Sequence, residues 1–413
     1  MSPTPVTFGL PTQPASYSWE ATDEEVAARF GLPVGDILRF DLNTSPAPPE
    51  IVAGLLAGGT FDAPLSEYPP SDYRRLVEVA ARVYGVSTDE LLVGAGADEI
   101  LDLIGKAFVP PGGAAVVPAP TYAMYRVVTE QRGANAVIVP RRGREAGYAL
   151  DLDATREAAR EAAVVWLCSP NNPTGLPEPD GSIAALLDDI ATDAAADGRP
   201  AAIVVVDEAY AEFVGTSLLE LRCGHPNLVV VRTASKAYAL AGLRVGFAIA
   251  RPETIARIAP YRPPGSVSTI SVTVVAEALA DPRGMQANVA RVDSERDRLA
   301  SGLRDAGWDV GPTVTNFLLA EFATTERAAA TATGLLRRGL VPRTFAAGHP
   351  LAHCLRLTIR DRAGNDRLIA AAREIESEQR PRAESAREIE SEQRPGAESA
   401  REIESEPRAE TGR

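Results

Sequence analysis

The sequence has little that would support a disulfide framework, a metal centre or a nucleic-acid surface. Its three cysteines, Cys168, Cys223 and Cys354, lie far apart without paired spacing, so neither disulfides nor a zinc site is predicted. The three histidines form no metal-binding motif, and we expect no metal. A formal net charge of −14 and the lack of a basic block argue against a nucleic-acid partner.

Long apolar runs are also missing. No stretch reaches the roughly 18 apolar residues that span a membrane, and the first twenty residues do not have the basic start and apolar run of a signal peptide. We therefore expect a protein of the reduced cytoplasmic compartment with no membrane partner. The 413 residues, 45 % of them hydrophobic, are enough to bury a sizeable core.

Strands and helices are predicted to alternate between residues 91 and 232. The runs VVWLC at 164–168, AIVVV at 202–206 and LVVV at 228–231 are continuously apolar, as expected for parallel strands that are covered on both faces. This order predicts an α/β fold with a mainly parallel, doubly wound sheet, and such sheets bind ligands outside the carboxyl ends of their strands.

The rest of the chain is predicted to add a smaller α/β domain and a tail. We expect an N-terminal segment (1–54) that joins the small domain, a large domain (55–280), the small domain (281–371) and a low-complexity tail (372–413). The tail holds three copies of a fourteen-residue unit that begins AREIES. Each copy has one Ile and is interrupted by Pro, so no buried face can form, and the tail is predicted to be disordered or transiently helical.

The segment RTASKAYALAGLRVG at 232–246 contains a candidate reactive amine. Lys236 directly follows Ser235, and Arg244 comes eight residues later. A lysine whose pKa is depressed can form a Schiff base with an aldehyde such as pyridoxal phosphate. The neighbouring hydroxyl and guanidinium suit a phosphate monoester. Taken alone, the pair is also consistent with a solvated lysine beside a helix-capping serine.

Two further segments could hold a planar, phosphorylated ligand. GAGADE at 94–99 follows a strand and opens a helix, so its backbone N–H groups could cradle an anion. It is no dinucleotide fingerprint, because Glu99 stands where the third glycine should be, and a plain helix start explains it too. Tyr122, just after a strand, could stack on a flat ring or be a core tyrosine.

Two strand ends carry polar side chains that suit a pyridine ring. Asp207 ends a buried apolar strand and needs a partner there, and a protonated pyridine nitrogen would serve. Asn172, in SPNNPTG, and Tyr210 could both bond a phenolate oxygen. A metal-binding interpretation of Asp207 also matches an apolar run before Asp, but no GxxxxGK[ST] motif precedes it.

Two arginines of the predicted small domain are candidates for substrate binding. Arg356 lies in the strand CLRLTI, and Arg343 precedes it by thirteen residues. A guanidinium can clamp a carboxylate or phosphate with two parallel hydrogen bonds. For both, a solvated face is the alternative.

Taken together, these motifs resemble the fold type I pyridoxal-phosphate aminotransferases, and the closest branch is the histidinol-phosphate aminotransferases. The resemblance rests on SPNNPTG, VVDEAY and RTASKAYALAGLRVG in this order, with SEYPP at 66–70, GAGADEIL at 94–101, NFLL at 316–319 and LRLT at 355–358. It covers roughly residues 35 to 372. Two segments depart from the family pattern: NTSP at 43–46 replaces NENP, and RPPGS at 262–266 replaces a Pro-Tyr segment.

The resemblance implies a role for each candidate residue. Lys236 would hold pyridoxal 5'-phosphate and shuttle a proton, and Asp207 would pair the pyridinium. Tyr210 and Asn172 would bond the phenolate oxygen, with Tyr122 stacked on the ring. The phosphate would be held by Ala97, Asp98, Thr233, Ser235 and Arg244, with Tyr68 from the other subunit of a homodimer. Arg356 and Arg343 would bind the substrate.

The implied reaction moves an amino group from L-histidinol phosphate to 2-oxoglutarate in histidine biosynthesis, giving imidazole acetol phosphate and L-glutamate. A lyase resembling threonine-phosphate decarboxylase needs the same groups, and an aminotransferase for another, aromatic amino acid would share the cofactor site. A non-catalytic ligand-binding module of a transcription regulator is a third hypothesis, although no helix-turn-helix precedes the domain.

Overall fold

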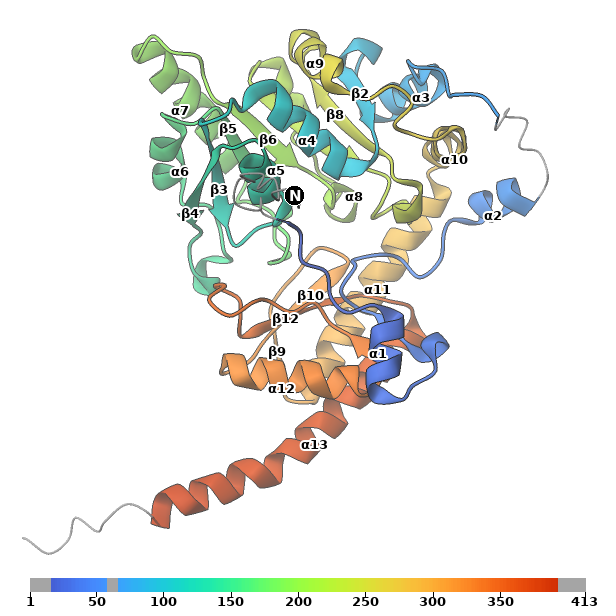
Figure 1. Cartoon of the computed structure of the whole chain (residues 1–413), viewed down its shortest axis with the longest axis vertical. Helices are drawn as coiled ribbons and strands as arrows, with labels where there is room; N and C mark the ends of the chain where they lie inside the picture. Colours follow the sequence, from blue (N-terminus) through green and yellow to red (C-terminus); the bar gives the residue numbers. More distant parts are fainter. Residues whose placement is uncertain (1–15, 58–65, 393–413) are drawn as a thin grey trace, which may run out of the picture.

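The chain forms two α/β domains with a ligand-sized cavity between them. The computed structural model describes residues 16–57 and 66–392 (Figure 1). The large domain occupies the upper part of the view and the small domain the lower part, and the described N-terminal residues run between them. Within these ranges, no helix combines the length and apolar character that a bilayer crossing requires.

The large domain is organised around a seven-stranded sheet of order β2-β8-β7-β6-β5-β3-β4. Its strands are β2 (Leu91–Gly94), β3 (Ala114–Ala119), β4 (Asn135–Pro140), β5 (Val164–Cys168), β6 (Ile203–Asp207), β7 (Leu228–Thr233) and β8 (Gly246–Ala250). Only β8 runs against the others. β8 was not predicted from the sequence. It follows β7 through a loop without the helical crossover that a parallel neighbour would need.

Helices cover both faces of this sheet. They are α2 (Glu50–Ala57), α3 (Arg74–Tyr84), α4 (Gly96–Phe108), α5 (Met124–Gln131), α6 (Leu152–Ala159), α7 (Ser182–Ala196), α9 (Pro252–Ile258) and α10 (Thr269–Ala280). The short α8 (Ala211–Val214) instead packs Phe213 against the core of the small domain. Buried residues of α3, α6, α7 and α10 pack on one face, and those of α4, α5 and α9 pack on the other. The doubly wound arrangement predicted from the sequence is confirmed.

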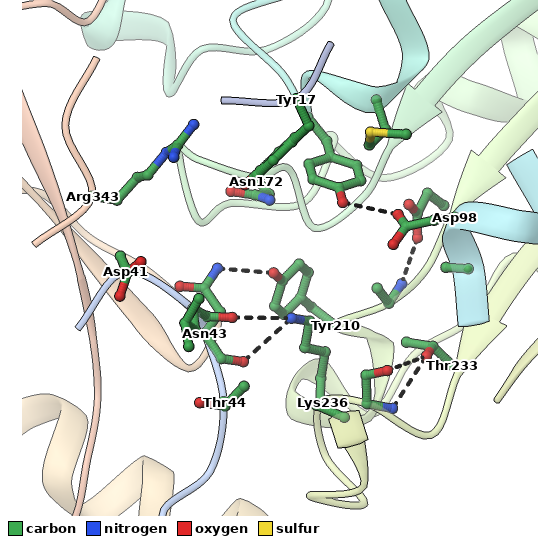
Figure 2. Close-up of a pocket in the computed structure, with 18 of the residues that line it drawn as sticks. Tyr17, Asp41, Asn43, Thr44, Asp98, Asn172, Tyr210, Thr233, Lys236 and Arg343 are labelled. Carbon is green, nitrogen blue, oxygen red and sulfur yellow. Dashed lines mark hydrogen bonds between the residues drawn. The ribbon is translucent and has the colours of Figure 1, made fainter. Parts of the chain in front are cut away.

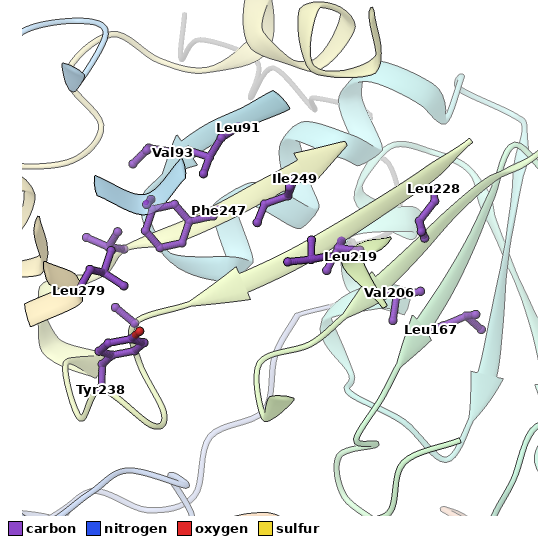
Figure 3. Close-up of a cluster of buried hydrophobic side chains, with 14 of the residues drawn as sticks. Leu91, Val93, Leu167, Val206, Leu219, Leu228, Tyr238, Phe247, Ile249 and Leu279 are labelled. Carbon is purple, nitrogen blue, oxygen red and sulfur yellow. The ribbon is translucent and has the colours of Figure 1, made fainter. Parts of the chain in front are cut away.

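Successive side chains along each central strand pack alternately into two separate hydrophobic cores, one on each face of the sheet. In β5, Leu167 enters one core (Figure 3) and Trp166 enters the other. Val206 and Phe247 join Leu167 on the first face, and all three are fully buried. Burial of a side chain of this size contributes about 1.5–3 kcal/mol. The apolar runs are continuous because neither face of these strands meets water.

The small domain combines the C-terminal part of the chain with the N-terminal segment. Its elements are α1 (Asp23–Phe30), β1 (Leu38–Arg39), α11 (Arg283–Asp305), β9 (Asp309–Val310), β10 (Phe317–Glu321), α12 (Thr325–Leu336), β11 (Leu340–Val341), β12 (Cys354–Thr358) and α13 (Arg362–Glu392). β1 pairs in parallel with β11, and β12-β10-β9 form an antiparallel sheet. α11 follows α10 of the large domain after a break at Asp281 and Pro282.

Two predicted domain limits differ from the structure. The limit between residues 54 and 55 falls inside α2, where Val52 belongs to the core of the large domain. The tail, predicted to be disordered or transiently helical from residue 372, begins within α13, and Ala372 and Ile375 are buried in the small domain. The single Ile of the first repeat therefore packs on the folded protein rather than on another repeat. Residues 393–413 of the predicted tail lie outside the described residues.

Candidate active site

A cavity of about 660 Å³ lies between the two domains, at the carboxyl ends of β5, β6 and β7 (Figure 2). It is lined by twelve of the predicted site residues: Ala97, Asp98, Tyr122, Asn172, Asp207, Tyr210, Thr233, Ser235, Lys236, Arg244, Arg343 and Arg356. Tyr68, the remaining candidate, does not line it and is 92 % exposed. The residues of the large domain meet here because parallel strands end at the same edge of the sheet, whereas Arg343 and Arg356 reach the cavity from the small domain.

Lys236 lies in the loop after β7, with its amine in the cavity. The Nζ atom is 3.4 Å from the carbonyl oxygen of Asn43 and 3.5 Å from that of Leu42. It has no ion-pair partner among the described residues. Burial, reinforced by the positive charge of Arg356, lowers the pKa of Lys236 to about 8. The amine is therefore easier to deprotonate than an ordinary lysine.

Asp207 ends β6 and is buried at the floor of the cavity. Its carboxylate accepts hydrogen bonds from the Tyr125 hydroxyl at 2.9 Å and from the Ala209 N–H at 3.0 Å. No cationic side chain of the described residues forms an ion pair with it. Burial raises the pKa of Asp207 to about 6. A buried carboxylate of this kind favours a cationic ligand.

Tyr125 is a site residue that the sequence analysis missed. Its ring is fully buried and stacks on Trp166 at 5.9 Å, and Tyr122 meets it edge-on at 5.7 Å. The signal was available, because Tyr125 follows Tyr122 by three residues, but only the structure shows which tyrosine reaches Asp207. The Tyr122 hydroxyl instead donates to Asp98 at 2.9 Å.

The start of α4 forms the end of the cavity nearest β8. Asp98 accepts a hydrogen bond from the Arg244 guanidinium at 3.2 Å. Gly246 allows β8 to lie close to the start of α4, because a Cβ added at this residue would lie 2.6 Å from the backbone nitrogen of Ala97. Thr233 donates to the Ser235 hydroxyl at 2.9 Å and accepts from its N–H at 3.1 Å. Backbone N–H groups, two hydroxyls and a guanidinium therefore converge, as anion sites require.

Arg356, from β12, reaches the cavity from the small domain. Its guanidinium donates to the Asn172 side-chain oxygen at 2.7 Å and to the Asp41 carbonyl oxygen. It is buried, and its Nε finds no hydrogen-bond partner among the described residues. A buried guanidinium without a carboxylate partner is suited to bind an anionic ligand.

Arg343 meets the N-terminal segment, which the sequence analysis did not place at the site. Arg343 donates to the Ser18 carbonyl oxygen at 2.7 Å, and its guanidinium lies 5.2 Å from the centre of the Tyr17 ring. Glu20 accepts hydrogen bonds from the Thr344 N–H and hydroxyl at 2.7 and 2.8 Å. Tyr17 and Trp19 both line the cavity, so this segment closes one side of it (Figure 2).

A group of possible metal ligands lies outside the cavity. Ligand atoms of Glu321, His353 and Cys354 lie within 4.8 Å of one another, because Glu321 and Cys354 pair across β10 and β12. The Arg144 guanidinium already contacts Glu321 at 3.1 Å, and the carboxylate therefore has a cationic partner.

Comparison with known proteins identifies the class to which this fold and cavity belong. Residues 57–371 match the family described as aminotransferase class I and II, and the chain belongs to that family. The family resemblance and the fold class predicted from the sequence are confirmed.

Histidinol-phosphate aminotransferases are among the similar proteins with more specific names. The chain is 36 % identical over 361 residues to the one from Roseiflexus castenholzii, covering 85 % of this chain and 93 % of that protein. It is 37 % identical over 317 residues to the one from Cronobacter sakazakii, covering 75 % and 84 %. The crystal structure of the Sinorhizobium meliloti enzyme in complex with pyridoxal-5'-phosphate superimposes with a TM-score of 0.77 at 26 % identity, covering 88 % of this chain and 96 % of that one.

Proposed function

We propose that this aminotransferase uses pyridoxal 5'-phosphate to transfer the amino group of L-histidinol phosphate to 2-oxoglutarate, which gives imidazole acetol phosphate and L-glutamate. The observation that carries the proposal is the meeting of an amine of lowered pKa, Lys236, with the buried carboxylate of Asp207 in one cavity. The substrate follows from the similarity to histidinol-phosphate aminotransferases over 85 % of the chain.

The residues around Asp207 fit the pyridine ring of this cofactor. The carboxylate has hydrogen-bond donors but no cation among the described residues, so a pyridinium would supply the missing charge. The Tyr122 ring lines the same cavity and offers a flat face, and Asn172 and Tyr210 offer donors for the phenolate oxygen. When bound, the cofactor supplies an electron sink for the bond that breaks at the substrate Cα.

The residues at the start of α4 fit the phosphate. Ala97 and Asp98 offer backbone N–H groups of the first helical turn, which lack partners within the helix. Thr233 and Ser235 offer hydroxyls that otherwise bond only nearby groups of their own segment. Arg244 adds a positive charge to this end of the cavity.

Lys236 acts as the base in this proposal. A pKa near 8 leaves part of the amine unprotonated at neutral pH, and it can bond an aldehyde carbon and later take the proton from the substrate Cα. Arg356 and Arg343 line the opposite side and bind the anionic groups of the two substrates.

The proposal includes a cytoplasmic homodimer. Tyr68 is too far from its own cavity to line it and is almost fully exposed. In a twofold dimer, an exposed residue of one subunit can complete the site of the other. We therefore assign Tyr68 to the phosphate of the partner subunit's cofactor.

A spectral half-reaction titration tests the proposed substrate. The purified holoenzyme is mixed separately with histidinol phosphate, phenylalanine, glutamate and threonine phosphate, without 2-oxoglutarate. We expect histidinol phosphate to convert the lysine-bound cofactor band at the lowest concentration and to stop after one turnover. No response to histidinol phosphate would refute the assignment, and continued turnover of threonine phosphate would identify a decarboxylase.

Lys236→Ala tests the assignment of the amine. We expect it to abolish the lysine-bound cofactor band and to lower the rate by at least about a thousandfold, because both the covalent attachment and the base are lost. Lys236→Arg is the matched control, since it keeps the positive charge but not the nucleophile. Full turnover in Lys236→Ala would remove the basis of the proposed mechanism.

A further inference from the structure

Asn43 contacts side chains of both domains at the cavity. Its side-chain amide lies 2.9 Å from the Tyr210 hydroxyl, and its carbonyl oxygen lies 3.4 Å from Lys236 Nζ (Figure 2). Its N–H donates to the Thr358 hydroxyl at 2.9 Å, and Asn316 donates to its carbonyl oxygen at 3.0 Å. The residue is 1 % exposed. It therefore ties β12 of the small domain to two side chains of the large domain.

The backbone of Asn43 has the left-handed conformation, with φ of 53°. Among residues with a side chain, Asn adopts this conformation most readily, and Gly adopts it without strain. The conformation turns the carbonyl oxygen of Asn43 to Lys236 while its amide side chain reaches Tyr210. Gly at this position would keep the backbone and lose only the amide.

The amide determines the direction in which Tyr210 can donate. A phenol has one proton to donate, whereas an amide NH₂ group can only donate. Because Asn43 Nδ2 donates to the Tyr210 oxygen, the single Tyr210 proton must go elsewhere. Tyr210 lines the cavity, where the proposed function needs a donor for the phenolate oxygen.

We propose that Asn43 is a positioning residue that directs the Tyr210 proton into the cavity. The inference rests on the proposed function, since it concerns how Tyr210 serves the cofactor. Asn43 does not need to touch the cofactor for this role. It acts by occupying an acceptor site of the Tyr210 oxygen, and its backbone carbonyl holds the Lys236 amine nearby.

The test is the pH midpoint of the lysine-bound cofactor band, measured in wild type, Asn43→Gly, Asn43→Asp and Tyr210→Phe. A donor to the phenolate oxygen stabilises the deprotonated form of the chromophore, so Tyr210→Phe should raise the midpoint by about one pH unit. Asn43→Asp replaces the donor by an acceptor that claims the Tyr210 proton, and we expect a rise at least as large. Asn43→Gly leaves the proton undirected and should give a smaller rise.

Each of the two Asn43 variants is also combined with Tyr210→Phe. With the hydroxyl already absent, Asn43→Gly should cause no further shift, whereas independent effects would add. Asn316→Asp is the charge control, because its side chain also contacts Asn43 but has no hydrogen bond to Tyr210 among the described residues. Its shift should be the same with and without Tyr210→Phe.

A second readout needs no cofactor. In the apo-protein, Asn43→Gly and Tyr210→Phe should each lower the free energy of unfolding. Their combined loss should be smaller than the sum of the two, because both substitutions remove the same hydrogen bond between Asn43 and Tyr210. Additive shifts and additive stabilities, or a wild-type midpoint in Asn43→Asp, would overturn the positioning role. A wild-type protein without a lysine-bound band would instead overturn the proposed function and this inference with it.

Discussion

Two ionisable side chains in the cavity have pKa values displaced toward neutrality before any ligand binds. Burial raises the pKa of Asp207 to about 6, and burial lowers that of Lys236 to about 8. In each residue the charged form is disfavoured, and the folded apo-protein is less stable for it. A cationic ring beside Asp207 and a covalent bond to Lys236 would relieve both costs.

Asp207→Asn should therefore stabilise the apo-protein while preventing tight binding of the cofactor. The pKa of Asp207 is raised on folding, so the folded state binds more protons than the unfolded state between about pH 4 and 6. The loss of stability caused by burying the charged Asp207 carboxylate is absent below this pH window and fully present above it. At pH 7.5 we expect the variant to gain about 3 kcal/mol in unfolding free energy, and at pH 4 to gain nothing.

Urea unfolding of the apo-protein at pH 4, 5 and 7.5 measures this gain. Asp180→Asn is the control, because this side chain is exposed and forms no ion pair among the described residues, so the change should leave stability unchanged at every pH. Equal stability of wild type and Asp207→Asn at pH 7.5 would contradict the conclusion that the buried, charged Asp207 carboxylate destabilises the folded apo-protein.

At the scale of secondary structure elements, the proposed phosphate site depends on how closely β8 approaches α4. Gly246 begins β8, and a Cβ there would collide with the backbone of Gly96 and Ala97 rather than with a flexible side chain. Neither segment can yield without moving the first turn of α4, whose N–H groups are proposed to hold the phosphate. The close contact thus joins the sheet to the site.

Gly246→Ala is expected to separate β8 from α4. Overpacking of this kind costs about 1–3 kcal/mol, and we expect the affinity for pyridoxal phosphate to fall at least about tenfold. Gly54→Ala is the matched control, since a Cβ at this exposed position of α2 meets nothing within 4 Å. It should be neutral or stabilise by up to about 1 kcal/mol. Wild-type cofactor affinity in Gly246→Ala, measured by fluorescence titration, would contradict the argument.

The first turns of α13 beyond residue 371 are expected to stabilise the small domain. Ile375 is fully buried in its core, and Glu376 accepts hydrogen bonds from Trp308 and Arg327. A chain that ends at Ala371 should lose about 3–5 kcal/mol relative to one that ends at Glu378, because it leaves a cavity and two unpaired donors. Thermal unfolding of both truncated proteins measures the difference, and equal stability would place the domain boundary at 371 as the sequence predicted.

At the scale of the whole molecule, the cavity joins the two domains, and the proposed dimer adds a second chain to it. The large domain contributes Lys236 and Asp207, and the small domain contributes Arg356 and Arg343. Tyr68, exposed on its own chain, would come from the partner. Each complete site would then combine residues of both domains of one subunit with a residue of the other subunit.

Mixing two variants, each of which we expect to lose activity on its own, tests whether sites are shared. In a hybrid of Lys236→Ala and Tyr68→Ala subunits, one site would carry both defects and the other neither. Random reassociation should therefore restore about one quarter of wild-type activity, since half of the dimers are hybrids with one intact site. The matched control replaces Tyr68→Ala by Asp207→Ala, whose defect stays in its own subunit's cavity, and this mixture should recover no activity. No recovery with Tyr68→Ala would refute site sharing.

Much of the lining of the candidate site could be predicted from the sequence because its residues lie in short segments at strand ends. Asp207 ends β6 and Lys236 follows β7, so the apolar runs that predict the strands also locate these side chains. Asn43, Tyr17 and Tyr125 could not be assigned in this way. Asn43 and Tyr17 reach the cavity from the N-terminal segment across a domain boundary, and Tyr125 differs from Tyr122 only in which buried group its hydroxyl meets.

The sequence by itself therefore determined the α/β class, the doubly wound sheet and the segments that carry the amine and the carboxylate. Local periodicity and strand ends encode these features. The tertiary structure alone decided the antiparallel β8, the partner of each hydroxyl and the pKa of each buried group. These depend on contacts between residues far apart in the chain, and on the water that those contacts exclude.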